Sequence, residues 1–208
     1  CSPSYITPKK KICFFYNSTS EKESQINEKE VSIMLKTIEK ASLPHLDALT
    51  EFYDRVTDHL EATVNYPKWT KGVYPSRESI QRAIEDGVQY ICTSDEKAVG
   101  AFILNRDPQG NYAAGEWTRN IPEGEYMVIH TLAVSPDCPR QGIGQFMIVY
   151  AIELAKVQGC KGIRLDVVPD NIPARRLYEK AGFTFAGEKD LKRDIPEIPL
   201  FALYELNF

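Results

Sequence analysis

The chain has 208 residues, of which 43% are apolar and 26% are charged, and its 25 Lys and Arg against 29 Asp and Glu give a formal net charge of −4. These fractions are ordinary for a globular protein, so the chain can bury a core and is not disordered over most of its length. The mild acidity, with no long basic block, excludes the positive surface typical of nonspecific binding to DNA or to an anionic membrane. We therefore expect a soluble, folded protein that binds neither nucleic acid nor membrane.

The cysteines and the first residues bear on the cellular compartment. No two cysteines have the close spacing of a zinc knuckle, so no metal site is expected; they are Cys1, Cys13, Cys92, Cys138 and Cys160. Their odd number is most simply explained by free thiols in a reducing compartment. No apolar run approaches the roughly 18 residues that cross a bilayer, and residues 1–11 lack the apolar stretch of a secretory signal. A cytoplasmic location is the expectation.

The composition changes near residue 33. Residues 17–30 are polar and cannot bury enough surface to order themselves, and the expected structure before them is one short strand over 12–16. Neither an internal repeat nor a long Gly/Ser-rich or Pro-rich linker divides the rest of the chain. We expect a polar N-terminal extension over 1–33 and a single domain over 34–208.

The first half of that domain reads as helix, helix and then strands. Apolar residues recur every third or fourth position from Leu43 onward, which predicts an amphipathic helix; they are Leu46, Leu49, Phe52, Val56 and Leu60. Ser76 can cap a short second helix that Gly87 ends. The strands expected in this half are 35–38, a hairpin of 88–93 and 98–104, and 126–134 after a polar loop.

The second half alternates strands and helices. The expected elements are a helix over 144–158, a strand over 162–168, a helix over 172–181, and strands over 183–187 and 200–206. The first of these helices has an apolar stripe that is expected to include Val157. Strands joined through helices are usually parallel and hairpin strands are antiparallel. The sequence therefore predicts an α/β or α+β domain with a central mixed sheet.

Residues 139–145, Pro-Arg-Gln-Gly-Ile-Gly-Gln, lie between the strand over 126–134 and the next helix. Glycines at alternate positions allow the backbone to turn several N–H groups toward one point, and the helix N-terminus adds a positive dipole. An anion such as a pyrophosphate would be stabilised there, although a tight strand-to-helix turn explains the same string equally well. The Walker lysine and the third glycine of a dinucleotide fingerprint are both missing.

A second motif begins at Asn171 and continues through the helix expected over 172–181. It consists of Asn171, Ala174, Leu177, Tyr178, Gly182 and Phe183. Together the two motifs resemble the GNAT superfamily of acyl-CoA-dependent N-acetyltransferases, whose pyrophosphate loop ends Gly-x-Gly and whose later segment has this pattern. The resemblance covers nearly all of residues 34–208. Pro139 departs from it, because the family usually has Gln or Arg there, but most of the phosphate cradle consists of backbone amides.

The resemblance implies a GNAT-like sheet, mixed but mostly antiparallel, with helices on both faces and a splayed central strand pair, 129–134 against 164–168. Acetyl-CoA would bind in the opening, with its pantetheine arm along the first strand and its pyrophosphate on the glycine loop. The cofactor-binding residues implied are Leu132, Ala133, Val134, Arg140, Gln141, Gly142, Ile143, Gly144, Gln145, Asn171, Ala174 and Tyr178.

Acetyl transfer to an amine requires an unprotonated nucleophile, stabilisation of an oxyanion and a proton for the departing thiolate. Tyr178 matches the family tyrosine that donates this proton; a core tyrosine on the apolar stripe is the alternative. His130 is the candidate base because histidine titrates near pH 6.5. Strand alternation places it with Val128 and Leu132, so a core histidine is a serious competitor.

Three carboxylates are rival bases that could act through water: Glu116, Glu125 and Asp166. Asp166 is unusual in a buried-looking strand, and we expect it to pair with Arg164, two residues earlier on the same face, or else with a substrate amine. Cys138 has no histidine partner at motif spacing and is treated as a bystander, which favours direct transfer in a ternary complex.

Aromatic residues in the loops are candidates for the acceptor site. They could form a wall for an aliphatic or cationic amine or could simply fill the loops; they are Tyr66, Trp69, Tyr74 and Trp117. The sequence thus predicts an acetyl-CoA-dependent N-acetyltransferase that acts on a small-molecule amine. The alternatives are an acetyltransferase for protein N-termini or lysines and a noncatalytic acyl-CoA-binding domain. Dimers are common among such enzymes, which makes a homodimer a candidate assembly.

Overall fold

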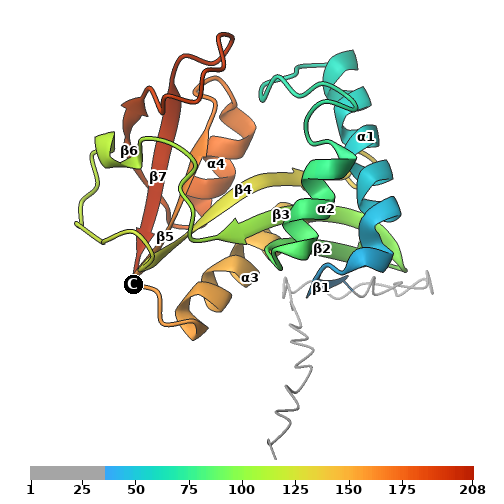
Figure 1. Cartoon of the computed structure of the whole chain (residues 1–208), viewed down its shortest axis with the longest axis horizontal. Coiled ribbons are helices and arrows are strands. Elements are labelled where there is room, and N and C mark those ends of the chain that lie inside the picture. The colour runs from blue at the N-terminus through green and yellow to red at the C-terminus, as the bar shows by residue number, and fades with distance from the viewer. Residues whose placement is uncertain (1–35) are drawn as a thin grey trace, which may run out of the picture.

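The computed structural model describes residues 36–208 (Figure 1). The expected extension over 1–33, its strand over 12–16, and Cys1 and Cys13 lie outside the described residues. Within residues 36–208, none of the helices combines the length and the apolar composition needed to cross a membrane.

The elements follow the predicted order, and most of their ends differ from the prediction by one or two residues. The strands are β1 (Lys36–Lys40), β2 (Gln89–Ser94), β3 (Lys97–Asn105), β4 (Tyr126–Val134), β5 (Gly162–Val167), β6 (Thr184–Lys189) and β7 (Phe201–Asn207). The helices are α1 (Leu46–Ala62), α2 (Arg77–Glu85), α3 (Ile143–Val157) and α4 (Ile172–Lys180), with short 3₁₀ turns at Leu43–His45 and Tyr112–Ala114.

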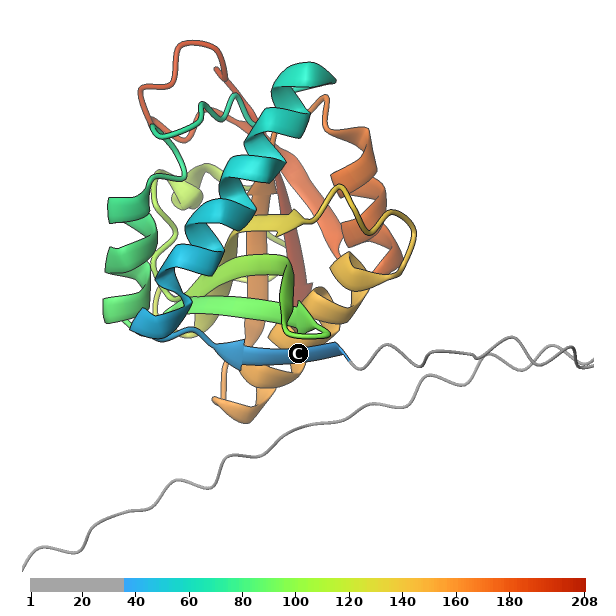
Figure 2. The ribbon, with the colours of Figure 1, turned by 90° about the vertical axis from the view of Figure 1, so that its right-hand side faces the viewer.

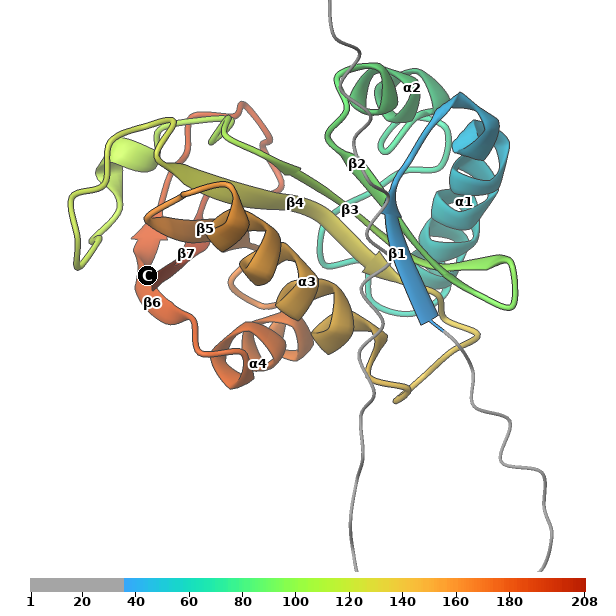
Figure 3. The ribbon, with the colours of Figure 1, turned by 90° about the horizontal axis from the view of Figure 1, so that it is seen from below.

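The strands form one sheet in the order β1-β2-β3-β4-β5-β7-β6. Among the strands of residues 36–208, only β4 and β5 pair in parallel and all other neighbours are antiparallel, which confirms the predicted mixed sheet. Seen from the side and from below, α1 and α2 lie on one face, and α3 and α4 lie on the other (Figures 2 and 3). Separate hydrophobic clusters fill the two layers.

Val157 corrects one expectation about the core. It was placed on the buried stripe of α3, but its side chain is 81% exposed. It is the last residue of the helix, next to the C-cap Gln158, and the buried positions of α3 lie earlier in the helix. The stripe of α3 is therefore shorter than the apolar pattern predicts.

The central strands separate partway along their length. Pairing between β4 and β5 runs from Tyr126 opposite Gly162 to Ile129 opposite Leu165 and then stops, although β4 continues to Val134. Beyond this point β4 turns away from β5, as Figure 1 shows. Within the described part of the chain, the last residues of β4 thus have no strand partner on the β5 side, and the sheet is splayed as expected.

A β-bulge in β4 lies just after Ile129, the last residue of β4 that pairs with β5. Ala101 pairs with Ala133 and Ile103 pairs with His130, so β4 has one residue more than β3 in this interval. Thr131 has φ +46°, a conformation that costs a β-branched residue on the order of 1–3 kcal/mol. The Tyr53 hydroxyl of α1 donates a hydrogen bond to the Thr131 carbonyl at 3.0 Å and supports the bulge.

The bulge reverses the alternation of side chains along β4. Val128 packs in the layer away from α3, whereas Leu132 and Val134 pack against the cluster under α3 and α4. The expectation that Leu132 shares a face with His130 is therefore wrong, because the extra residue shifts the period of the strand.

Candidate active site

A cavity of about 980 Å³ opens where β4 and β5 separate. One wall is β4 from Ile129 to Val134, the opposite wall is the first part of α4, and the loop after α1 closes a third side. Ten residues predicted for the site line this cavity: Tyr66, Trp69, Tyr74, His130, Leu132, Ala133, Val134, Asn171, Ala174 and Tyr178. Segments more than a hundred residues apart in the chain therefore meet at one opening.

The predicted anion loop lies beyond the cavity, between β4 and the start of α3. Gly142 is the N-cap of α3 with φ +71°, and no side chain of residues 36–208 caps this helix. Gly144 is needed for a different reason, since a Cβ there would lie 2.9 Å from Cδ2 of Leu177 on α4. The Lys36 ammonium donates to the Gln141 carbonyl at 2.5 Å and brings a positive charge to the loop. This end of α3 can hold an anion.

Asn171 has a structural role that is compatible with its predicted one. Its Oδ1 accepts a hydrogen bond from the backbone N–H of Ala174 at 3.2 Å, which caps α4. The cap orients the first turn of the helix, one turn before the position of Tyr178. Asn171 therefore shapes the wall of the cavity even without touching a ligand.

Tyr178 is 6% exposed and its ring packs against Phe183 and Tyr204, with centroids 6.1 Å and 6.2 Å away. Burial, and then the negative charge of Asp166, raises the pKa of the Tyr178 phenol well above its ordinary value. Among residues 36–208, no hydrogen bond to its hydroxyl is present. A protonated phenol that lines the cavity without a protein partner can donate a proton to a bound group.

His130 is 8% exposed and is held by the loop after β3. Its Nε2 lies 2.9 Å from the Asp107 carbonyl and 3.2 Å from Oδ1 of Asn105. The Asp107 N–H donates to the same Oδ1 at 3.0 Å, which fixes the orientation of the Asn105 amide. Both partners of Nε2 can only accept, so we assign the hydrogen to Nε2 and leave Nδ1 as the basic nitrogen. Burial lowers the pKa of His130, and the negative charge of Asp166 opposes this effect.

Asp166 pairs with a residue that the sequence did not indicate. Two nitrogens of Arg193 lie 2.7 Å and 2.8 Å from its carboxylate oxygens, and the Tyr112 hydroxyl donates to it at 2.6 Å. The expected partner, Arg164, instead lies between the rings of Trp117 and Tyr126, 4.0 Å and 4.1 Å from their centroids. The pairing with Arg164 was wrong because the side chain of Asp166 reaches the loop before β7. Both carboxylate oxygens of Asp166 are therefore already engaged by protein side chains.

The other two rival bases lie away from the cavity. Glu116 pairs with Lys189 at 2.7 Å, and Glu125 pairs with Lys161. Neither glutamate lines the opening beside β4. Of the four candidates for the base, His130 is therefore the one that lies in the cavity with a nitrogen available.

Three of the four predicted aromatic residues form part of the cavity wall. The Trp69 ring meets Tyr74 edge-on at 6.2 Å, and Tyr66 lies in the same loop. Trp117 does not line the cavity: it stacks on Tyr112 at 5.7 Å and donates through Nε1 to the Tyr112 carbonyl. This corrects the placement of Trp117 in the acceptor wall, because the loop over 105–124 folds against β5 and β7 instead.

Sequence reasoning missed the residues that support the site from a distance. Tyr53 holds the bulge, Asn105 orients His130, and Arg193 neutralises Asp166. Tyr53 follows Phe52 in the predicted helix, and a buried tyrosine hydroxyl needs a hydrogen-bond partner, which is the signal that could have identified it. Arg193 carries no local signal, because its partner lies 27 residues away.

Comparison with known proteins gives a consistent assignment. The model of the Acetyltransferase (GNAT) family matches residues 51–183. A mycothiol acetyltransferase of Clavibacter michiganensis subsp. michiganensis is 32% identical over 82 residues, which is 39% of this chain and 26% of that protein. A streptothricin acetyltransferase of Escherichia coli is 29% identical over 121 residues, which is 57% of this chain and 61% of that protein. The chain thus spans less than two thirds of the length of either relative.

Solved structures share the fold. The ribosomal-protein-S18-alanine N-acetyltransferase from Escherichia coli superposes with a TM-score of 0.60 over 83% of this chain and 94% of that one, at 17% identity. Such low identity shows a common fold and nothing further. The family match over more than half of the chain, together with the splayed sheet, means that this chain belongs to the GNAT family of acetyltransferases.

Proposed function

We propose that this protein transfers the acetyl group of acetyl-CoA directly to a primary amine of a small molecule. The observation that supports this most is that one cavity is lined by the end of β4 that does not pair with β5, by Tyr178 and by His130. A groove for the acyl donor, a proton donor and a proton acceptor are the parts that the reaction needs.

The residues present fit coenzyme A in two respects. The backbone of β4 after Ile129 has no partner on the β5 side, so its polar groups can pair with an amide-bearing chain laid along it. The N-terminus of α3 suits a diphosphate, because Arg140 lies in the loop before it and Lys36 of β1 reaches the carbonyl of Gln141 in that loop. When bound there, acetyl-CoA supplies the thioester that reacts.

The remaining chemistry falls to side chains. Nδ1 of His130 takes the proton that the acceptor nitrogen loses, and burial keeps this imidazole neutral at neutral pH. The hydroxyl of Tyr178 gives its proton to the departing sulfur. No protein nucleophile is needed for this route, and Cys138 does not line the cavity.

A small acceptor is supported by the aromatic wall of Trp69 and Tyr74, which suits an amine with an aliphatic or cationic body. The two curated relatives are named for mycothiol and streptothricin, whereas the structural neighbour is named for an alanine of a ribosomal protein. Peptide acetylation is therefore the alternative that an experiment must address.

The test measures thiol release from acetyl-CoA with a panel of small amines and peptides. Tyr178→Phe should lower kcat by about 100-fold or more, the usual size of a general acid's contribution. Tyr150→Phe is the matched control, because this tyrosine of α3 packs against Tyr90 and Phe102 away from the cavity. Turnover of peptides alone would refute the small-molecule acceptor. Acetyl-CoA binding without turnover of any acceptor would show a noncatalytic domain.

A further inference from the structure

A second cavity adjoins the first. It has a volume of about 360 Å³ and lies between α2 and the loop after β3, and we call it the α2 cavity. Tyr74, Gln109 and Thr131 line both cavities, so these three residues form their common boundary. Because Thr131 follows His130 directly in β4, a ligand in the α2 cavity can extend one end toward the proposed base.

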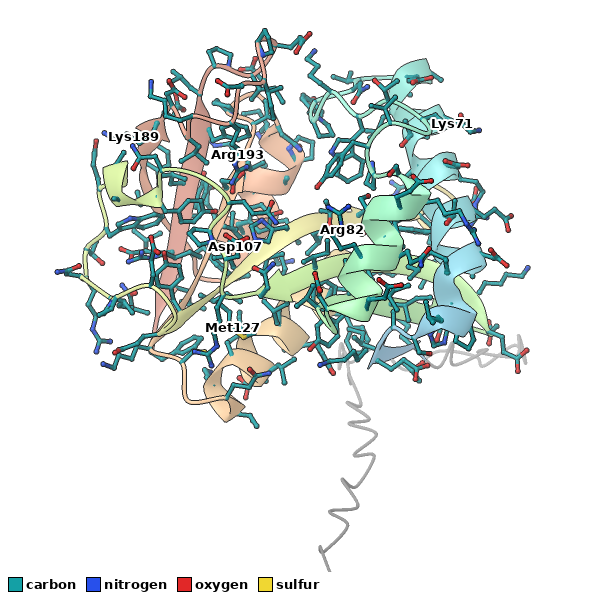
Figure 4. The ribbon with its side chains drawn as sticks, in the orientation of Figure 1. Lys71, Arg82, Asp107, Met127, Lys189 and Arg193 are labelled. Atoms are coloured by element: carbon teal, nitrogen blue, oxygen red, sulfur yellow. The ribbon has the colours of Figure 1, made fainter. Side chains whose placement is uncertain are left out.

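Three charged residues line the α2 cavity; all three are exposed to solvent, and none forms an ion pair with another described residue. Arg82 lies in the last turn of α2, Asp86 is the C-cap of that helix, and Asp107 lies in the loop after β3. Figure 4 places Arg82 and Asp107 on opposite sides of the opening between the two halves of the molecule. Among residues 36–208, none of the three has an ion-pair partner within 4.0 Å, and Oδ1 of Asp107 accepts only the N–H of Gln109 at 2.9 Å.

These charges define a ligand. A guanidinium is suited to binding a carboxylate through two parallel hydrogen bonds, and an ammonium is suited to carboxylates such as those of Asp86 and Asp107. A ligand with one positive and one negative group would complement these three charges. An apolar ligand would displace water from them without replacing its hydrogen bonds. A free amino-acid head group carries this pair of charges.

We propose that the α2 cavity binds the α-ammonium and α-carboxylate of a diamino acid, whose side-chain amine then extends past Thr131 to be acetylated. This inference rests on the proposed function and narrows its acceptor to one chemical class. Arg82 sets the preference for a carboxylate, and Asp86 with Asp107 sets the preference for an ammonium. Arg82 and Asp86 would determine specificity and take no part in the chemical step, because they line the α2 cavity and not the cavity that holds His130 and Tyr178.

Three acceptors that differ by one group each provide the test. Lysine carries both charged groups, cadaverine lacks the carboxylate, and ε-aminocaproate lacks the α-ammonium. We expect kcat/KM for lysine to exceed that for either analogue by about tenfold, the effect of one charged hydrogen-bonded contact. Mass spectrometry should place the acetyl group on Nε, and acetylation of the α-amine would overturn the proposed orientation.

Variants of α2 assign each preference to a side chain. Arg82→Ala should remove the preference for lysine over cadaverine, while Arg77→Ala should keep it, because Arg77 pairs with Asp47 and does not line the cavity. Asp86→Asn should reduce the preference for lysine over ε-aminocaproate, and Glu85→Gln is its control, since Glu85 bonds Gln81 on the outer face. Equal preferences in all four variants would overturn the inference.

A binding measurement separates this inference from the proposed function. Calorimetric titration of lysine into the protein with coenzyme A needs no turnover, and it should show binding that Arg82→Ala weakens about tenfold. If monoamines are acetylated but lysine has no advantage and no Arg82-dependent binding, the inference fails and the proposed function stands. If lysine binds through Arg82 but no amine is acetylated, the proposed function fails and the binding of an amino-acid head group in the α2 cavity stands.

Discussion

Replacing Arg193 with methionine tests the role of the ion pair between Arg193 and Asp166, two residues that line the cavity beside β4. Arg193 and Asp166 form a bidentate ion pair, and their side chains are 19% and 9% exposed. In Arg193→Met the carboxylate of Asp166 would keep only the Tyr112 hydroxyl as a partner. A carboxylate that stays charged and buried after losing its cation destabilises the folded state.

The size of the effect follows from this burial. Breaking a buried ion pair costs about 3–5 kcal/mol, and the remaining exposure of Arg193 favours the lower end, about 3 kcal/mol. For a chain of this length each kcal/mol lowers Tm by roughly 2–4 °C, so we expect Tm to fall by about 6–12 °C. The second substitution Asp166→Asn removes the unpaired charge and should recover much of this loss.

Urea unfolding and thermal melts of the single and double variants measure the effect. Lys192→Met is the matched control, because the neighbouring ion pair of Lys192 with Asp190 is on the surface and should contribute nothing measurable. A loss below about 1 kcal/mol in Arg193→Met, or a double variant no more stable than the single one, would refute the claim that this pair is buried and coupled.

Three further outcomes follow from contacts at the site. Tyr53→Phe leaves the Thr131 carbonyl at the bulge without its donor, so the free energy of unfolding should fall by about 1–2 kcal/mol in urea titrations and KM for the acceptor should rise. Asn171→Ala removes the cap of α4 and should cost about 1 kcal/mol by the same measurement, whereas Asn171→Asp should retain most of it. The lowered pKa of His130 means that, between this value and the ordinary 6.5, the unfolded chain binds more protons than the folded one. Stability should therefore increase with pH in that window and decline as pH falls below 6.5, and His130→Gln, compared at each pH, should lack this dependence.

Local patterns were sufficient for most of the fold. Both bounds of β4 match the predicted strand over 126–134, because the run is rich in β-branched and apolar residues and Gly124 precedes it. The motif around Tyr178 likewise predicted a helix whose residues line the cavity. Periodicity and turn residues act over a few positions, and these elements depend on nothing more distant.

The predictions that failed depended on distant contacts. Asp166 was matched to Arg164 because they are two residues apart on one strand, but Arg193 reaches it from a loop that the sequence does not place. Trp117 was a candidate for the acceptor wall because it lies in a central loop, with packing of that loop as the alternative, and its position depends on how the loop folds against Tyr112. Nothing in the sequence around Thr131 indicates a β-bulge, so the reversal of side-chain alternation in β4 was also missed.

The extra residue at Thr131 changes which positions of β4 face each layer of the protein, so that Ile129 and Leu132 pack in the same cluster although they are three residues apart. Before it, β4 directs His130 toward the loop of Asp107, and after it the same strand directs Leu132 and Val134 toward α3 and α4. Deleting one residue there would restore regular pairing with β3. It would also move each later side chain of β4, including Leu132 and Val134, to the opposite face of the sheet. Natural variation at this site should therefore tolerate changes of side chain far better than changes of length.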